Sequence, residues 1–268
     1  MTEASARPAR PTVAQIREVC QPPAVRGRRN SEHWVADVYL RAISPYLTRV
    51  LLRTRITANG VTWLMVATGV SAALALLIPG LSGAVLAALL GQMQMLWDCC
   101  DGEVARWRST TSPKGVFIDR VGHYTTEGLI PIALGLRAAG FPGEGWLDTP
   151  WPLIGALVSV LVLYNKSLND MVHVSRAYNN LPRLEEKADV ASPRSGGLRR
   201  LRSIARFFPF HRAYHSVELT LLALVAAVID LPLGDLAATR FLVAFLAVFG
   251  VITVIGHLAS ILSSSRLR

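Results

Sequence analysis

Residues 61–97 read VTWLMVATGVSAALALLIPGLSGAVLAALLGQMQMLW, and this stretch decides the fold class. It holds two uncharged apolar runs, Val61–Ile78 and Leu81–Trp97, which are separated only by Pro79-Gly80. Each run is about as long as a helix needs to be to cross the roughly 30 Å hydrocarbon core of a bilayer. In lipid such a run must be helical, because each backbone polar group has to find its partner within the segment. The stretch therefore predicts two consecutive transmembrane helices.

Four further apolar runs extend this pattern toward the C-terminus: Val116–Ala139, Trp151–Tyr164, Val217–Leu233 and Ala237–Leu262. The run that begins at Trp151 is short, and we expect the polar residues after it to complete the span. Apolar residues make up 51% of the 268 residues and charged residues only 17%, against about a quarter in an average soluble domain. This composition excludes a disordered chain and an ordinary soluble globule. We predict an all-α polytopic membrane protein with six transmembrane helices.

The N-terminal part of the chain differs from these runs. Residues 1–30 are rich in Arg, Pro and Ala and predict a flexible basic arm. Residues 31–53 place apolar side chains at spacings of three and four, interrupted by arginines. This is the pattern of an amphipathic helix that lies on the cytoplasmic surface of the bilayer. We therefore divide the chain into the arm and one membrane domain, residues 31–268.

Charge gives the orientation. The chain has 28 Lys and Arg against 18 Asp and Glu, a formal net charge of +10. With the N-terminus inside, only Arg137 and Arg240 fall on the non-cytoplasmic side, and this bias predicts both termini in the cytoplasm. The basic loop 174–212 resembles an RNA-binding arm by itself, but a cytoplasmic loop near lipid headgroups explains it better. We expect the lipid bilayer, and no nucleic acid, as a partner.

Carboxylates gather at the cytoplasmic ends of the second and third predicted spans. Charged groups at this depth are costly and mark functional sites by default. At 100° per residue, Asp98 and Asp101 share one stripe of the second helix, and Asp119, His123 and Glu127 share one stripe of the third. A short turn makes the two helices antiparallel neighbours, so the stripes can face each other. The pattern predicts a cage of hard oxygen ligands that suits Mg²⁺ or Mn²⁺.

Small residues accompany these carboxylates. Gly102 and Ala105 leave space beside them, and Gly115 opens the start of the next helix. Arg106 offers a forked donor of the kind that binds phosphate. The segment therefore predicts a site for a phosphate-bearing ligand.

The motif resembles that of a known family. Residues 98–123 read DCCDGEVAR, then eight residues, then GVFIDRVGH. This is similar to the signature of the CDP-alcohol phosphatidyltransferases, D-x-x-D-G-x-x-A-R, a short gap, then G-x-x-x-D-x-x-x-D. Seven of the eight fixed positions are matched, and His123 stands in place of the last Asp. The segment Ala58-Asn59-Gly60-Val61-Thr62 is similar to one that often precedes the family's first span, and the layout of a surface helix and six spans also fits.

The resemblance implies a reaction and a set of roles. The family transfers a substituted phosphate from a CDP-alcohol to a hydroxyl acceptor and releases CMP, as in phospholipid or polyol-phosphate lipid biosynthesis. Asp98, Asp101 and Asp119 would hold two divalent ions, with His123 as a further ligand. The nucleotide pocket would be formed by Gly102, Ala105, Arg106, Gly115, Asn59 and Thr62.

The resemblance also implies partners and a location. The donor would be CDP-diacylglycerol or a CDP-linked small alcohol, and the acceptor an inositol-like alcohol or a sugar phosphate. Four basic residues on the cytoplasmic side could contact a phosphate on the acceptor, although the positive-inside bias explains them equally well: Lys166, Arg176, Arg212 and His215. The active site would lie on the cytoplasmic side, and the protein would be a homodimer.

The departure at His123 leaves two interpretations open. The last Asp of the family motif is thought to deprotonate the acceptor, and an imidazole that is partly neutral at pH 7 could take that role. Glu127, one turn further, could orient the ring. His123 could instead, or in addition, be a metal ligand. In the other interpretation the site binds nucleotide but has lost activity.

A third hypothesis belongs to another class of protein. The acidic cluster could be the ion site of a cation transporter. The carboxylates lie at one membrane face and not at the midplane, and no broken-helix repeat is visible, which disfavours this hypothesis.

Overall fold

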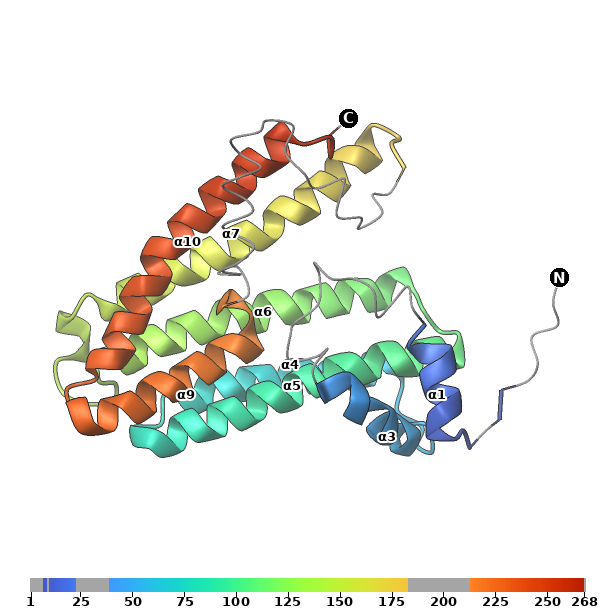
Figure 1. Cartoon of the computed structure of the whole chain (residues 1–268), viewed down its shortest axis with the longest axis horizontal. Coiled ribbons are helices and arrows are strands. Elements are labelled where there is room, and N and C mark those ends of the chain that lie inside the picture. The colour runs from blue at the N-terminus through green and yellow to red at the C-terminus, as the bar shows by residue number, and fades with distance from the viewer. Residues whose placement is uncertain (1–6, 9, 23–38, 183–212, 268) are drawn as a thin grey trace. The chain divides into compact units, whose positions relative to one another are not determined.

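The computed structural model describes residues 7–8, 10–22, 39–182 and 213–267, and these residues contain helices and no strand. The predicted all-α class is therefore confirmed. Five helices are long and apolar enough to cross a membrane: α4 (Ala58–Leu76), α5 (Gly80–Arg108), α7 (Trp151–Tyr178), α9 (Ser216–Leu233) and α10 (Ala237–Ser263). Figure 1 shows them in chain order. The short run after Trp151 is completed by polar residues, as expected.

The remaining predicted span forms helix α6 (Pro113–Ala138), which is long but has no stretch as apolar as those of the other five. Its first half carries Lys114, Asp119, Arg120 and His123, and Glu127 follows. Length and composition therefore do not settle whether α6 crosses the membrane, and the count of six spans stays a prediction.

The chain forms two compact units. Unit 1 comprises residues 1–71 and 89–125, and unit 2 comprises residues 72–88 and 126–268. Helices α4, α5 and α6 have residues in both units. We describe each unit by itself.

Unit 1 contains two short helices besides its parts of α4, α5 and α6. Helix α3 (Arg41–Leu51) lies in the segment predicted to be an amphipathic surface helix, of which residues 31–38 lie outside the described chain. One side of α3 is buried, and Leu51 packs with Val61 of α4 and with Cys100 and Val104 of α5. The exposed side carries Tyr46 and Val50. The buried side includes the polar Ser44 and Thr48, so the place of α3 on the cytoplasmic surface of a bilayer stays a prediction.

Helix α1 (Val13–Cys20) forms within the segment for which composition predicted a flexible arm. A capping box begins it, in which the Thr12 hydroxyl accepts from the Gln15 backbone N–H at 3.2 Å and the Gln15 side chain accepts from the Thr12 N–H at 2.8 Å. Ile16 and Cys20 are fully buried and pack with Trp107 of α5. A helix of eight residues is not stable alone, so this tertiary contact is what orders it.

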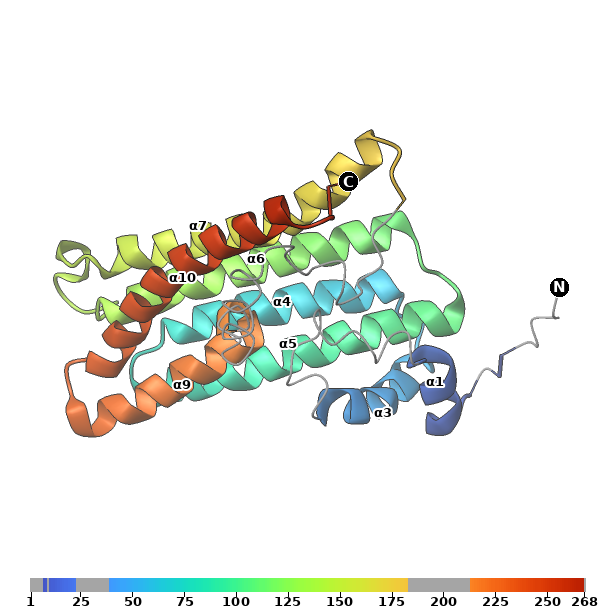
Figure 2. The ribbon, with the colours of Figure 1, turned by 45° about the horizontal axis from the view of Figure 1, so that its top comes forward.

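In unit 2, α7 and α10 lie side by side, as Figures 1 and 2 show from two directions. Leu168 and Val172 of α7 pack against Ile261 of α10. Helices α6 and α7 approach closely at a pair of glycines, since a Cβ on Gly155 would lie 2.7 Å from the Cα of Gly135. Small residues at such crossings are typical of helices that pack in membranes.

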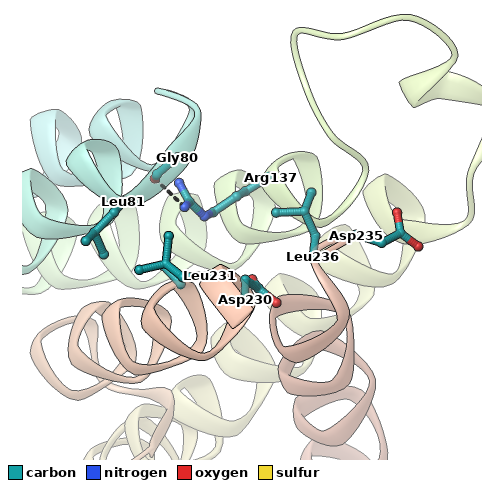
Figure 3. Close-up of a pocket in the computed structure, with 8 residues that line it drawn as sticks. Gly80, Leu81, Arg137, Asp230, Leu231, Asp235 and Leu236 are labelled. Atoms are coloured by element: carbon teal, nitrogen blue, oxygen red, sulfur yellow. Dashed lines mark hydrogen bonds between the residues drawn. The ribbon is translucent and has the colours of Figure 1, made fainter. Parts of the chain in front are cut away.

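A buried arginine joins three helix ends of unit 2. Arg137, near the end of α6, is only 5% exposed and donates to the carbonyl oxygen of Ile78 at 3.0 Å. It also donates to the carbonyl oxygen of Gly80 at 2.6 Å, as Figure 3 shows. The Ile78 carbonyl belongs to the turn that follows α4, where backbone acceptors have no partner in a helix, and Gly80 begins α5. Arg137 and Asp230 of α9 both line a cavity of about 210 Å³. Asp230 also caps α10, since its carboxylate accepts from the Ala238 N–H at 2.7 Å. Arg137 is therefore a structural residue of this end of the bundle.

We predict that Arg137→Met destabilises the protein, because it leaves the carbonyls of the α4–α5 turn without their charged donor. A loss of about 3 kcal/mol is expected for buried bonds to a charged group. In detergent this would lower the apparent Tm by roughly 5–10 °C. The matched control is Arg240→Met, because Arg240 is more exposed than Arg137, donates to the Ala138 carbonyl alone and otherwise pairs with Asp235, which is 87% exposed, so its loss should cost less. Equal losses from the two variants would contradict this role.

Candidate metal and nucleotide site

The candidate metal ligands all belong to unit 1, and three of them form a compact cluster. One ligand atom each from Asp98, Asp119 and His123 lies within 4.8 Å of the others. His123 Nε2 is 2.8 Å from Asp98 Oδ1 and 3.4 Å from Asp119 Oδ1. Helix α5 supplies Asp98, and α6 supplies the other two at positions four residues apart. The facing stripes expected from the sequence are therefore present at these three residues.

The cluster is partly buried. The side chains of His123, Asp98 and Asp119 are 14%, 24% and 36% exposed. Two carboxylates and an imidazole thus share a region that solvent reaches only in part, so that their charges are incompletely screened. A divalent cation would relieve the repulsion between the carboxylates.

The donor set fits such a cation. Mg²⁺ holds its ligands at about 2.1 Å, so two ligand atoms of one ion are at most about 4.2 Å apart. The 4.8 Å span of the cluster is close to this limit, and small side-chain rotations would close the difference. Carboxylate oxygens suit Mg²⁺ and Mn²⁺, and imidazole is compatible with Mn²⁺ more than with Mg²⁺.

Asp101 takes a different position from the three clustered residues. Its Oδ2 accepts a hydrogen bond from the Thr62 hydroxyl of α4 at 2.7 Å. It also interacts electrostatically with Asp98, Asp119 and His123, so it lies near the cluster without belonging to it. Thr62, which the sequence assigned to the nucleotide pocket, therefore orients a candidate metal ligand.

The glycines of the motif are places of close approach. A Cβ at Gly102 would lie 2.9 Å from Arg106 Nη1, so the guanidinium lies over this glycine. A Cβ at Gly115 would lie 3.2 Å from Asn59 Oδ1, so the start of α4 lies close to the start of α6 at this glycine. Ala105, one position before Arg106, is partly buried on the same helix. The structure thus pairs Gly102 with Arg106, and Gly115 with Asn59.

One glycine that sequence reasoning missed also matters to the site. A Cβ at Gly122 would lie 2.5 Å from the Met65 side chain and 2.7 Å from that of Val66, both on α4. Only a glycine lets α6 pass α4 this closely, and His123 is the next residue. The signal in the sequence was a glycine within a predicted helix, directly before the candidate ligand His123.

Glu127 lies in unit 2, and its contacts were not foreseen. The carboxylate is 3% exposed, accepts from Lys166 Nζ at 2.7 Å and lies 3.6 Å from His215 Nδ1. A phosphate on the acceptor would have to compete with this carboxylate for Lys166. The role of Glu127 in orienting His123 stays a prediction.

Sequence reasoning also missed Glu103, which occupies a variable position of the motif. Glu103 is fully buried and accepts from the hydroxyls of Ser44 and Thr48 of α3, each at 2.6 Å. The carboxylate therefore ties α3 to the motif helix. A glutamate between the motif glycine and arginine gave no signal of burial.

Comparison with known proteins agrees with this geometry. Residues 55–175 match the family model described as CDP-alcohol phosphatidyltransferase, which is the family that the motif resembles. The matched segment includes the metal cluster, Asp101, Arg106 and Glu127, and it begins after α3. No curated protein matches the chain. The resemblance drawn from the motif is thus confirmed by a match that extends well beyond the motif itself.

We predict that Asp119→Asn weakens Mn²⁺ binding at least about tenfold, because it removes one charged ligand from the cluster. Electron paramagnetic resonance of the purified protein would measure free Mn²⁺ in a titration. Asp148→Asn, at an exposed carboxylate of the 3-10 helix Trp146–Asp148, is the matched control and should leave binding unchanged. Unaltered binding by Asp119→Asn would remove Asp119 from the ligand set.

Proposed function

We propose that this protein is a metal-dependent CDP-alcohol phosphotransferase of the membrane. It would transfer a substituted phosphate from a CDP-alcohol to a hydroxyl acceptor and release CMP. The observation that carries the proposal is the cluster of Asp98, Asp119 and His123, formed by the two halves of a motif inside the matched segment.

The chemistry that these residues must support is a displacement at phosphorus. The acceptor oxygen forms a bond to the phosphorus that bears the donor's alcohol, and the bond from that phosphorus to the oxygen of CMP breaks. When bound, divalent ions would neutralise the diphosphate and the leaving CMP. Little covalent help is needed, because phosphoryl transfer depends mainly on positioning and on stabilisation of charge.

We assign the residues accordingly. Asp98, Asp101 and Asp119 would hold the metal, with His123 beside them. Arg106, over Gly102, would receive the negative charge of the diphosphate, since a guanidinium matches phosphate with two donors. Thr62 would act through Asp101, and Asn59 with Gly115 would border the pocket where α6 begins.

His123 would accept the proton that the acceptor hydroxyl loses. It stands at the position of the family motif's last Asp. Its Nε2 donates to the Asp98 carboxylate, so Nε2 would become the proton acceptor once Asp98 binds the metal. In this arrangement the proton acceptor and the metal-bound phosphate would be neighbours, as in-line attack requires.

The location of the site follows from helix length. From Gly80 to Asp98 helix α5 rises about 27 Å, close to the thickness of the hydrocarbon core. Asp98 would therefore lie at the membrane surface, and the bias of positive charge supports the cytoplasmic side for that surface. A polar donor head group and a soluble acceptor could both reach it there. The homodimer stays a prediction.

The primary test measures CMP release by the purified protein. Donors would be CDP-diacylglycerol and CDP-linked small alcohols, and acceptors would be polyols, polyol phosphates and amino alcohols, with Mn²⁺ or Mg²⁺ and then with chelator. We expect chelator-sensitive release with one pair, and a loss of at least about 100-fold in Asp98→Asn, because removing a ligand should cost more than removing its supporting partners. Asp148→Asn should keep full activity.

Two other outcomes would overturn the proposal. Tight binding of CDP-alcohols without turnover under any acceptor would indicate a relative that has lost activity. Uptake of metal into proteoliposomes without CMP release would indicate a transporter.

We predict that His123→Ala lowers kcat by about 10²- to 10⁴-fold, the usual contribution of a general base. His123→Asp, which restores the family motif, should recover most of this loss. The affinity for Mn²⁺, measured on the same samples, separates the two roles of His123. A fall in Mn²⁺ affinity that accounts for the loss of activity would make His123 a ligand and not the base.

A further inference from the structure

Helix α1 packs against the end of the motif helix, although it lies outside the segment matched by the family model. Ile16 and Cys20 are fully buried, and Trp107, their partner on α5, is 7% exposed. Trp107 directly follows Arg106, so the apolar contact is made beside the arginine of the motif. Arg7, before α1, donates to the backbone carbonyls of Arg106 and Trp107.

A hydrogen bond connects α1 to the side chain of Arg106. The carbonyl oxygen of Cys20, the last residue of α1, accepts from Arg106 Nε at 2.7 Å. The bond holds the inner edge of the guanidinium, and the two outer nitrogens lie over Gly102. An arginine side chain is long and flexible, so fixing Nε removes much of its freedom before any ligand arrives.

Glu103, one turn before Arg106 on α5, reinforces this contact. Its carboxylate accepts from Gln21 Nε2 at 2.8 Å, and Gln21 is the C-cap of α1. The Cys20 thiol lies 3.3 Å from the Glu103 carbonyl oxygen, to which it donates. Gln21 Nε2 also lies 2.8 Å from the Arg41 carbonyl oxygen at the start of α3. The C-terminal end of α1 is therefore fixed to α5 through Glu103, which lies between Gly102 and Arg106, and through Trp107, which follows Arg106.

We propose that α1 is a positioning element of the nucleotide pocket, which holds Arg106 over Gly102 through the Cys20 carbonyl and the bond from Gln21 to Glu103. This inference rests on the proposed function, since it assumes that Arg106 receives the diphosphate of a CDP-alcohol. A preorganised arginine binds its anion with less loss of conformational entropy, so docking of α1 should strengthen nucleotide binding. By linkage, bound nucleotide should strengthen docking by the same factor.

The first experiment undocks α1 without touching the motif. Ile16→Asn puts a polar side chain into the buried contact with Trp107, and Ala14→Asn, on the exposed side of the same helix, is the matched control. In Ile16→Asn we expect the KM for the CDP-alcohol and the Kd for CDP to rise about tenfold, as expected when one charge-assisted contact is weakened. Mn²⁺ affinity should stay within about twofold of the wild type, which shows that the rest of unit 1 is folded. Ala14→Asn should match the wild type.

A second variant keeps the apolar contact intact. Gln21→Ala removes the bonds from Nε2 to Glu103 and to the Arg41 carbonyl but leaves Ile16 packed against Trp107, so α1 should stay folded. It should raise the same KM by a smaller factor and leave Mn²⁺ binding unchanged. A uniform loss of activity with no change in KM would assign α1 a purely structural role and overturn the proposal.

The second experiment uses Cys20 as a reporter of docking. Burial raises the pKa of its thiol to about 11, with a further contribution from Glu103, so the docked thiol is both shielded and protonated at neutral pH. Alkylation at Cys20, followed by mass spectrometry of its peptide, therefore reports the fraction of time that α1 is undocked. We expect CDP with Mn²⁺ to slow alkylation several-fold in the wild type. In Ile16→Asn alkylation should be fast with or without CDP.

The outcomes separate this inference from the proposed function. A wild type that neither releases CMP nor binds CDP would overturn the proposed function, and this is visible without any variant. A wild type that binds CDP with no effect on Cys20 alkylation would overturn the role of α1 alone. So would an Ile16→Asn protein that exposes Cys20 yet keeps the KM of the wild type.

Discussion

Two carboxylates of unit 1, Asp98 and Asp119, lie against a single imidazole, and the remaining features of the site depend on that contact. Like charges at this distance, in a region that water reaches only in part, repel each other strongly. One histidine can offset part of this repulsion, and Asp101 adds a third carboxylate nearby. The arrangement is therefore suited to a divalent cation, and the helices that hold it must resist being pushed apart.

The packing of unit 1 supplies that resistance in two ways. Gly122 lets α6 lie directly on α4, so the segment that carries Asp119 and His123 cannot move back without losing this contact. Glu103, on the opposite side of α5 from solvent, fastens α3 and α1 to the motif helix with three hydrogen bonds. A buried carboxylate whose donors all come from other helices acts as a specific connection, since any displacement leaves an uncompensated charge. The candidate metal-binding residues are thus held in place by residues that do not bind the metal themselves.

The sequence predicted the features that depend on local pattern. Apolar runs predicted the helices. The cluster followed from helical periodicity together with the short turn between α5 and α6, which makes the two helices neighbours. It did not predict α1, since an eight-residue helix in a basic segment is ordered by its contact with Trp107 and not by its composition. It did not predict the pairing of Glu127 with Lys166, because the two residues are distant in sequence and each has a local explanation. Both missed features are contacts between helices that are distant in sequence, and the periodicity within one helix does not predict such contacts.

The two arginines that break the charge bias strengthen the proposed orientation. Arg137 and Arg240 are the basic residues predicted on the non-cytoplasmic side, and each donates to backbone carbonyls at a helix end: Arg137 to those of Leu76 and Ile78, and Arg240 to that of Ala138. Their charges are used within unit 2 to satisfy acceptors that a membrane helix leaves open at its C-terminus. A positive charge that is bound in this way has a structural reason to be there. The asymmetry of the other Lys and Arg residues is therefore even stronger than their number suggests, and it favours a site that opens to the cytoplasm.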